Sequence, residues 1–206
     1  MVIYLHGFAS GPESTKARYF CPLLRQAGVE THAPDLAAGD FENLTITGQL
    51  AVIERLAAGR PVTLIGSSMG GYLAALYAAR HRETERLVLL APAFAFPTRW
   101  PETLGPEAMA AWRKNGWMAV FHYGDRQQRN LSYRLIEDGR LYEDFPDFTQ
   151  PALIFHGKND TVVPPLASEH FAAARPNVHL EVVDSGHELT DVLPYLWNKM
   201  REFLLE

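Results

Sequence analysis

Several protein classes are excluded by what this sequence lacks. Its 206 residues include a single cysteine, Cys21, so an intramolecular disulfide cannot form and a reducing compartment is expected. The helical, partly apolar neighbourhood of Cys21 favours a packed residue over a nucleophile. No apolar run approaches the roughly 20 residues of a membrane span, and no charged leader precedes the opening Val-Ile-Tyr-Leu. We therefore expect a cytoplasmic protein with no membrane partner.

Positive charge is also scarce. The chain has 19 Lys and Arg against 24 Asp and Glu, a net charge of -5, whereas proteins that bind phosphate backbones carry a basic excess. The dinucleotide-binding pattern G-x-G-x-x-G and the phosphate-binding pattern G-x-x-x-x-G-K-[ST] are both absent. No His or Cys cluster has zinc-ligand spacing. We expect no nucleic-acid partner, no metal and no cofactor, and no feature of the sequence indicates an oligomeric state.

What is present is an ordinary globular composition, with 47% hydrophobic and 21% charged residues, and a length that suits one domain. Short apolar runs alternate with longer helical patterns, which is typical of an α/β fold with a mostly parallel sheet and helices on both faces. The predicted strands are Val2 to Leu5, Glu30 to Ala33, Pro61 to Ile65, Arg86 to Leu90, Ala152 to Phe155 and Leu180 to Val183. The predicted helices are Glu13 to Gln26, Thr47 to Ala58, Met69 to Arg80, Pro165 to Ala174 and Glu188 to Leu205.

Residues 92–150 break this alternation and are predicted to be an insertion within the single domain of residues 1–206. Within it, Glu107 to Lys114 should be helical, whereas Trp117 to Tyr123 fits a strand or a helix. The insertion holds three of the four tryptophans. Its aromatic side chains either form a small core of their own or line a ligand cleft as an apolar wall. Under the second interpretation, the candidate substrate-binding residues are Phe94, Trp100, Trp112 and Trp117.

The motif with the clearest chemistry is Gly66-Ser67-Ser68-Met69-Gly70, between a predicted strand and a predicted helix. It matches G-x-S-x-G in the strand-turn-helix context in which a sharp turn exposes a serine hydroxyl, so Ser68 is a candidate nucleophile. The alternative is a tight turn or an anion-binding loop, because a helix N-terminus after glycines attracts anions. The flanking glycines and the strand before them favour the nucleophile.

A serine nucleophile needs a base, and the base needs a carboxylate behind it. His187 follows the last predicted strand and Asp160 follows the one before it, so both should lie at the carboxyl edge of the sheet with Ser68. Asp35 and Asp184 are competing carboxylates. Asp35 more readily braces a loop, and Asp184 is too close in sequence to point freely at His187. We therefore expect the chain order Ser, Asp, His.

An acyl-transfer site also needs donors for the developing oxyanion. The backbone N–H of Met69, directly after the nucleophile, and that of Phe8, in the loop after the first strand, are the candidates. Gly7 allows that loop to turn toward the site. His6 is more readily a structural hydrogen-bonding residue than a second base.

These motifs resemble the α/β-hydrolase superfamily, and Tyr-Leu-His-Gly-Phe together with Ser-Ser-Met-Gly-Gly looks like the YqiA-type small bacterial esterases. The resemblance spans the whole chain. It implies a nucleophile at Ser68, an acid at Asp160, a base at His187 and an oxyanion loop at Gly7 and Phe8. The aromatic insertion departs from the smallest members and looks like a cap after the strand that follows the nucleophile.

The sequence thus predicts a serine carboxylic ester hydrolase that acts on small-molecule esters of short to medium acyl chains through an acyl-enzyme. An acyl thioesterase would use the same residues, and the residues alone do not separate the two. A non-catalytic binding module on the same fold is the alternative from another class, and the complete set of five roles argues against it.

Overall fold

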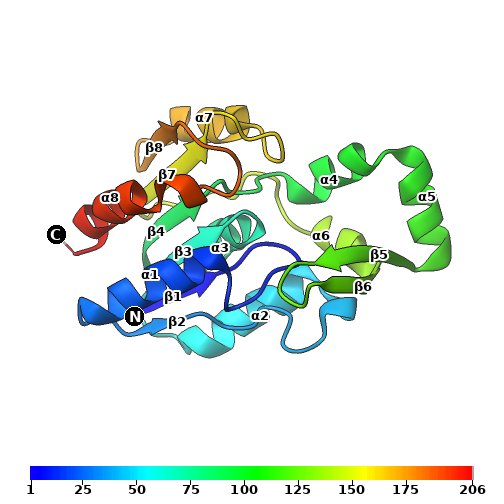
Figure 1. The fold of residues 1–206 in the computed structure, drawn as a ribbon, viewed down its shortest axis with the longest axis horizontal. Coiled ribbons are helices and arrows are strands. Elements are labelled where there is room, and N and C mark those ends of the chain that lie inside the picture. Colours follow the sequence, from blue (N-terminus) through cyan, green and yellow to red (C-terminus); the bar gives the residue numbers. More distant parts are fainter. Residues whose placement is uncertain (206) are drawn as a thin grey trace.

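A six-stranded parallel sheet forms the centre of the molecule (Figure 1). The computed structural model describes residues 1–205. The strands lie in the order β2-β1-β3-β4-β7-β8, and every pair is parallel. This arrangement confirms the predicted α/β fold. The strands are β1 (Val2–Leu5), β2 (Thr31–His32), β3 (Val62–Ser67), β4 (Thr84–Leu90), β7 (Ala152–Gly157) and β8 (Val178–Val183).

Helices cover both faces of the sheet because its central strands are apolar on both sides. In β1, Ile3 and Leu5 pack into the core on one face, whereas Val2 and Tyr4 pack into the core on the other. The first face carries α2 (Ile46–Ala57), α3 (Met69–Arg80) and α7 (Pro165–Ala173), and the second carries α1 (Thr15–Gln26) and α8 (Leu193–Leu205).

The last helix begins later than the sequence pattern indicates. Residues from Glu188 onward were expected to be helical, but Leu189 has a φ of 55° and a short 3-10 turn covers Thr190–Val192 before α8 begins at Leu193. Pro194 lies in the first turn of α8, where a proline costs no hydrogen bond, and this favours a helix start at that point. The consequence is a longer loop after β8, and that loop carries His187.

The segment between β4 and β7 folds into more elements than were predicted. The helix expected at Glu107 to Lys114 is present as part of α5, and the run from Trp117, left open between strand and helix, is a strand. That strand pairs antiparallel with a second one to form a hairpin that the sequence did not indicate. The elements are α4 (Phe96–Leu104), α5 (Pro106–Asn115), β5 (Trp117–His122), β6 (Gln127–Ser132) and α6 (Arg134–Gly139).

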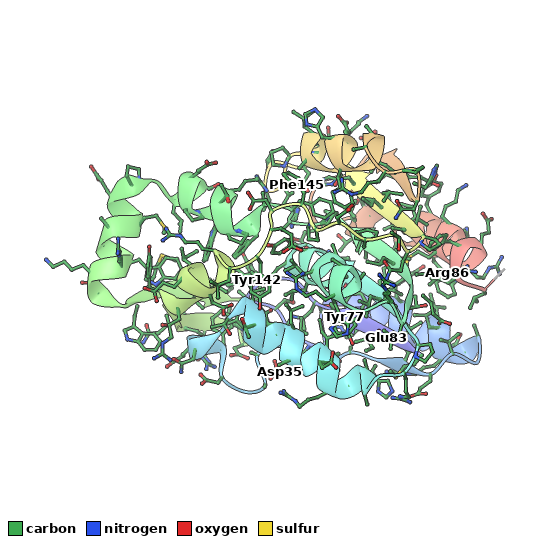
Figure 2. All side chains as sticks on the ribbon, turned by 180° about the vertical axis from the view of Figure 1, so that it is seen from behind. Asp35, Tyr77, Glu83, Arg86, Tyr142 and Phe145 are labelled. Atoms are coloured by element: carbon green, nitrogen blue, oxygen red, sulfur yellow. The ribbon has the colours of Figure 1, made fainter. Side chains whose placement is uncertain are left out.

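Polar contacts fasten this segment to α2 and α3. Figure 2 shows Tyr142 beside these helices in the view from behind. The Thr47 hydroxyl lies 2.7 Å from the Tyr142 hydroxyl, and the Thr47 backbone N–H donates to Asp138 at 2.8 Å. The Arg80 guanidinium donates to the Glu143 carboxylate at 2.7 Å. The segment is therefore held against these helices by α6 and by the loop that follows it.

Close packing of β1 against the start of α3 depends on a glycine. A Cβ atom on Gly70 would lie 2.1 Å from the carbonyl oxygen of Leu5 and 2.6 Å from that of His6, so no side chain fits there without backbone movement. We expect Gly70→Ala to lower the free energy of unfolding by about 3 kcal/mol, the upper part of the range for overpacked cores. Urea unfolding measures this change.

The matched control for that substitution is Gly11→Ala, because a Cβ atom there meets nothing within 4 Å. A change within about 0.5 kcal/mol is expected for this variant, as at other sites without packing constraints. Equal unfolding midpoints for the Gly70 and Gly11 variants would show that the approach of α3 to β1 is not tight.

Candidate active site

Ser68 occupies a sharp turn between β3 and α3. Its backbone has φ 53° and ψ -116°, a conformation that residues with a Cβ atom rarely adopt and that costs on the order of 1–3 kcal/mol. The turn also needs a residue without a side chain at Gly66, because a Cβ atom there would lie 2.2 Å from the carbonyl oxygen of Gly70. The strained turn presents the Ser68 hydroxyl beyond the end of the strand, toward the cavity described below.

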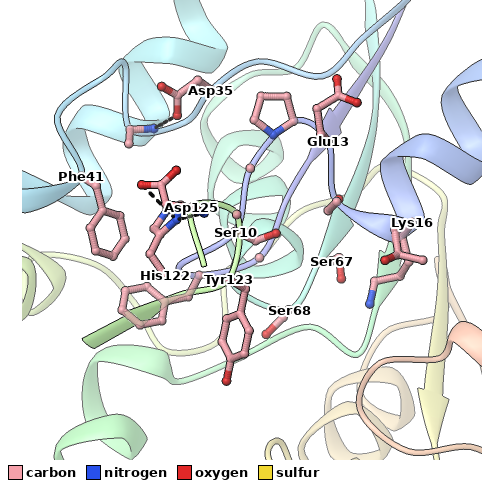
Figure 3. Close-up of a pocket in the computed structure, with 18 of the residues that line it drawn as sticks. Ser10, Glu13, Lys16, Asp35, Phe41, Ser67, Ser68, His122, Tyr123 and Asp125 are labelled. Carbon is pink, nitrogen blue, oxygen red and sulfur yellow. Dashed lines mark hydrogen bonds and ion pairs between the residues drawn. The ribbon is translucent and has the colours of Figure 1, made fainter. Parts of the chain in front are cut away.

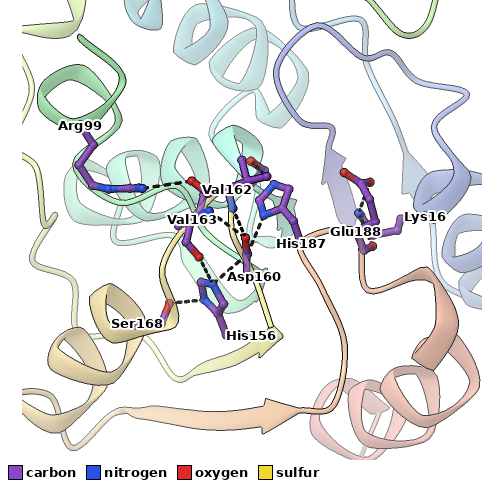
Figure 4. A network of polar contacts seen from close by, with 10 residues as sticks. Lys16, Arg99, His156, Asp160, Val162, Val163, Ser168, His187 and Glu188 are labelled. Atoms are coloured by element: carbon purple, nitrogen blue, oxygen red, sulfur yellow. Dashed lines mark hydrogen bonds and ion pairs between the residues drawn. The ribbon is translucent and has the colours of Figure 1, made fainter. Parts of the chain in front are cut away.

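The structure brings together the three side chains predicted from the sequence, Ser68, His187 and Asp160. Figure 4 shows two of them, His187 and Asp160. The Ser68 Oγ lies 3.0 Å from His187 Nε2, and His187 Nδ1 lies 2.7 Å from Asp160 Oδ2. In this geometry Nδ1–H donates to the carboxylate, which leaves Nε2 free to accept the serine proton. The three residues follow β3, β7 and β8, so the carboxyl edge of the parallel sheet positions all of them.

Asp160 accepts four hydrogen bonds. Oδ1 accepts from the backbone N–H groups of Val162 and Val163, each at 2.8 Å, and Oδ2 accepts from His187 and from His156 Nε2 at 3.1 Å. Burial alone would raise the pKa of this carboxyl. The hydrogen bonds from His156, His187 and Val163 outweigh it and hold the pKa well below its usual range, so Asp160 is a carboxylate at neutral pH.

His156 is the residue at this site that sequence reasoning missed. Its side chain is fully buried, and its Nδ1 lies 2.8 Å from the Ser168 hydroxyl. Its Nε2 also lies 2.8 Å from the carbonyl oxygen of Val163, so one ring connects β7, α7 and the loop that carries Asp160. The available signal was a histidine inside a strand that is otherwise apolar, because a buried imidazole needs partners at both nitrogens.

The two competing carboxylates are engaged elsewhere. Asp35 accepts from the backbone N–H groups of Ala37 and Gly39, at 3.0 and 2.7 Å, and so braces its own loop as expected. Asp184 is exposed, lies 3.1 Å from the Lys158 ammonium and accepts from Asn159. These contacts leave Asp160 as the only carboxylate among residues 1–205 that is hydrogen-bonded to the His187 ring.

Two backbone N–H groups lie beside Ser68 without a protein acceptor. Among residues 1–205, neither the Phe8 nor the Met69 N–H donates to another residue, and a Cβ atom on Gly7 would lie 3.6 Å from the Ser68 Cβ. The loop after β1 therefore passes close to the serine. His6 fixes this loop, because its Nδ1 donates to the Gly7 carbonyl oxygen at 2.9 Å and its Nε2 accepts from the backbone N–H of Leu36 at 3.2 Å.

The hydroxyl of Ser68 and the ring of His187 open into a cavity of about 1220 Å³ (Figure 3). Its walls come from the loop and helix start at residues 10–18, the loop at residues 35–41 and the turn of the β5–β6 hairpin. The lining is mixed, with apolar side chains such as Phe8, Phe41 and Tyr123 beside charged and polar ones. The charged and polar side chains include Glu13, Lys16, Arg18, Asp35, His122, Asp125, Arg126 and Arg129.

The four aromatic residues predicted to bind substrate do not line this cavity. Trp112 is buried in the core and donates from its indole N–H to the carbonyl oxygen of Leu131 at 2.9 Å. Phe94 is fully buried against Phe171, with 4.2 Å between ring centroids. Trp117 is exposed on the hairpin, and Trp100 packs between Phe8 and Trp112. The first interpretation, a small aromatic core, describes Phe94 and Trp112, because both are buried in the core and neither lines the cavity.

Two further observations concern other classes of site. Within residues 1–205, no group of three or more His, Cys, Asp or Glu side chains has an arrangement that could hold a metal ion. No helix in the same range combines the length and apolarity needed to cross a membrane.

The sheet order and the serine turn define an α/β-hydrolase fold, and solved structures share it. A protein described as a hydrolase, from Agrobacterium vitis S4, is 25% identical with a TM-score of 0.81, covering 98% of this chain and 86% of that one. Est1E from Butyrivibrio proteoclasticus with ferulic acid bound is 24% identical with a TM-score of 0.82, covering 99% and 87%. Mouse alpha/beta hydrolase domain-containing protein 10 is 18% identical with a TM-score of 0.83, covering 98% and 88%.

The chain belongs to the family described as Uncharacterised protein family (UPF0227), whose model matches residues 1–204. No curated protein matches the chain. The fold is thus that of known esterases and hydrolases, and the family spans almost the whole chain.

Proposed function

We propose that the chain is a serine hydrolase of carboxylic esters that acts through an acyl-enzyme. The observation that carries this proposal is the unbroken chain of hydrogen bonds from Ser68 through His187 to Asp160, beside an open cavity. This arrangement lets an imidazole remove the serine proton while a buried carboxylate stabilises the imidazolium that forms. The shared fold with esterases supports the same reaction class.

The proposed reaction has two halves, acylation of Ser68 and hydrolysis of the acyl-enzyme, and His187 transfers a proton in both. Ser68 Oγ attacks the ester carbonyl carbon as its proton moves to His187 Nε2, and the carbonyl oxygen becomes an oxyanion that accepts from the N–H groups of Phe8 and Met69. His187 then protonates the leaving alcohol as the C–O bond breaks, which leaves the acyl group on Ser68. Water, deprotonated by His187, attacks the acyl-enzyme, and the carboxylic acid departs as the proton returns to Ser68.

In this proposal His156 is a positioning residue that acts through Asp160. Its Nε2–H is shared between the Val163 carbonyl oxygen and the carboxylate oxygen that accepts from His187. It therefore fixes the carboxylate orientation, and the carboxylate in turn fixes the His187 ring with Nε2 toward the serine.

The cavity supports a small-molecule ester as substrate, and the ferulic acid held by Est1E supports the same class. We propose that residues 92–150 act as a cap, because the hairpin turn from His122 to Arg129 forms one wall of the cavity. The four aromatic residues predicted to bind substrate do not line this cavity, so they give no basis for a preference among acyl chain lengths.

A fluorophosphonate probe tests the proposed nucleophile directly, because it phosphonylates only a serine that is activated as a nucleophile. The chain offers a matched control in the neighbouring Ser67, which is buried. We expect the parent protein and Ser67→Ala to be labelled and to hydrolyse phenyl acetate, and Ser68→Ala to do neither. Mass spectrometry of the labelled peptide identifies the modified residue.

Labelling of Ser68→Ala at the rate of the parent protein would assign the nucleophile to another residue. Absence of labelling in the parent protein, together with absence of ester hydrolysis, would instead favour a binding module on this fold.

A further inference from the structure

One wall of the cavity, at the start of α1, carries a buried ammonium group. The Lys16 side chain is only 9% exposed, yet it lines the cavity beside Ser68. Its Nζ donates to the carbonyl oxygen of Glu188 at 2.7 Å and lies 3.4 Å from the carboxylate of the same residue (Figure 4). Burial lowers the pKa of Lys16, and the Glu188 carboxylate opposes that shift. An ammonium has three N–H groups, so one donor remains for a ligand.

The same wall also carries a buried hydroxyl. Tyr4 is fully buried and lines the cavity, and within residues 1–205 its hydroxyl makes no hydrogen bond of standard geometry, although the Ser14 and Ser67 hydroxyls lie near it. Burial raises the pKa of Tyr4 well above its usual range, so the group is a hydroxyl donor at any physiological pH. Buried polar atoms without partners are rare in folded proteins, and one beside a cavity indicates a place for a ligand.

The backbone of α1 adds to these donors. Ser14 caps the helix by accepting from the N–H of Ala17, whereas the N–H groups of Thr15 and Lys16 have no acceptor among residues 1–205. Both residues line the cavity, and no acidic residue lies in the first turn. A helix N-terminus of this kind favours negative charge.

We propose that this wall, formed by Tyr4, Lys16 and the first turn of α1, is a subsite for an anionic group on the alcohol half of the ester. A carboxylate or a phosphate would accept from the Lys16 ammonium, the Tyr4 hydroxyl and the open backbone N–H groups together. This inference rests on the proposed esterase function. The alcohol half is assigned because Lys16 contacts Glu188, the residue after His187, and His187 protonates the departing alcohol.

The subsite predicts a preference between two esters that differ only in charge. We compare kcat/KM for 3-acetoxybenzoate with that for 3-acetoxybenzamide, its neutral isostere, and add 3-acetoxyphenyl phosphate to separate phosphate from carboxylate. The parent protein should prefer the anionic esters by roughly tenfold or more, as expected for hydrogen bonds to a charged group. Lys16→Met should bring this ratio close to one.

The matched control is Lys114→Met, which removes one exposed positive charge from α5. It should keep the parent ratio, because a change of net charge alone does not alter a local contact. A ratio near one in the parent protein, or equal ratios in the Lys16 and Lys114 variants, would overturn the subsite. A preference for 4-nitrophenyl hemisuccinate over 4-nitrophenyl butyrate, without one for 3-acetoxybenzoate, would overturn the assignment to the alcohol half.

Tyr4→Phe separates a binding role from a structural one. If the hydroxyl serves only a ligand, its removal should raise the melting temperature of the free protein and lower the preference for the anionic esters. A structural hydroxyl would give the opposite result, a lower melting temperature with an unchanged preference, and would remove Tyr4 from the subsite.

Binding to the Ser68→Ala protein distinguishes failure of the subsite from failure of the esterase proposal. We expect benzoate and inorganic phosphate to bind this variant in calorimetric titrations, and the added Lys16→Met substitution to weaken that binding at least tenfold. Binding without ester hydrolysis by the parent protein would keep the subsite and reject the esterase. Ester hydrolysis by the parent protein, without anion binding or a charge preference, would keep the esterase and reject the subsite.

Discussion

Ser68→Ala is expected to lower kcat/KM for ester hydrolysis by about 10⁶-fold, the loss found when a serine that works as a unit with its histidine is removed. The reason is geometric. Its Oγ lies 3.0 Å from His187 Nε2, so the substitution deletes both the attacking atom and the proton that the imidazole accepts. Initial rates on phenyl acetate, measured at equal concentrations of parent and variant, give the ratio.

The fold of the Ser68 variant should be retained, because the substitution removes one hydroxyl and leaves the packing around the turn unchanged. Matching far-ultraviolet circular dichroism and a melting temperature within a few degrees of the parent check this. Residual turnover above about one percent of the parent rate, reproduced in independent preparations, would exclude Ser68 as the nucleophile.

The site residues that could be predicted from the sequence are those that closely follow a strand of the sheet. Ser68, Asp160 and His187 each follow a predicted strand, and parallel strands end at the same edge of a sheet, so the chain order alone places them together. All six strands could be located from the sequence, although only β1 has the predicted limits and the other five differ by one to two residues at one or both ends. A continuously apolar run such as Val2–Leu5 is buried on both faces, which a central parallel strand requires.

The residues that the sequence did not reveal have roles that depend on contacts between distant segments of the chain. His156 fits a buried strand by its position, and only the folded chain shows its Nε2 against Asp160 and its Nδ1 against Ser168. Lys16 lies on an amphipathic helix whose pattern indicates a surface charge, whereas the fold turns it toward Glu188 and the cavity. Periodicity reports which face of an element is buried, not which partner lies opposite.

The aromatic residues of the insertion illustrate the same limit. Their number predicts that several must be buried, and Phe94 and Trp112 are. Composition does not indicate whether buried rings face a ligand or each other. Here the ring of Trp112 stacks edge-on against Trp100 and Tyr133, so its apolar surface is used within the insertion. The turn of the β5–β6 hairpin, which includes Tyr123, lines the cavity, whereas Phe94 and Trp112 do not.

Asp160→Asn is expected to lower kcat/KM by roughly 10⁴-fold, the loss seen when the carboxylate of such a triad becomes an amide. Asp160 accepts on both oxygens, from two backbone N–H groups on one and from His156 and His187 on the other. An amide has one oxygen and one NH₂ group, so it can satisfy only one of these two sides. If its NH₂ faces His187, the ring must carry its proton on Nε2 and cannot accept from Ser68.

If the amide oxygen faces the histidines instead, the NH₂ group opposes the N–H groups of Val162 and Val163, which costs stability. Either orientation therefore predicts a loss, in activity or in stability. The pH dependence of the stability of the parent protein is a second test, because it depends on the Asp160 carboxylate. Its pKa is held well below the usual range in the folded protein, so its stabilisation is fully present above the unfolded pKa near 4 and is lost as the pH falls toward the folded value. Urea unfolding between about pH 2 and pH 7 should show a smaller decline in stability at low pH for Asp160→Asn than for the parent protein.

Asp184→Asn is the matched comparison, because that carboxylate is exposed and pairs with Lys158. It should keep kcat/KM within about threefold of the parent value, since the ion pair is exposed and the carboxylate is not hydrogen-bonded to the His187 ring. A 10⁴-fold loss in Asp184→Asn with full activity in Asp160→Asn would assign the acid to Asp184. Such a result would require the loop after β8 to reorganise when substrate binds, because in this structure the Asp184 side chain is directed to Lys158 and Asn159 rather than to the imidazole.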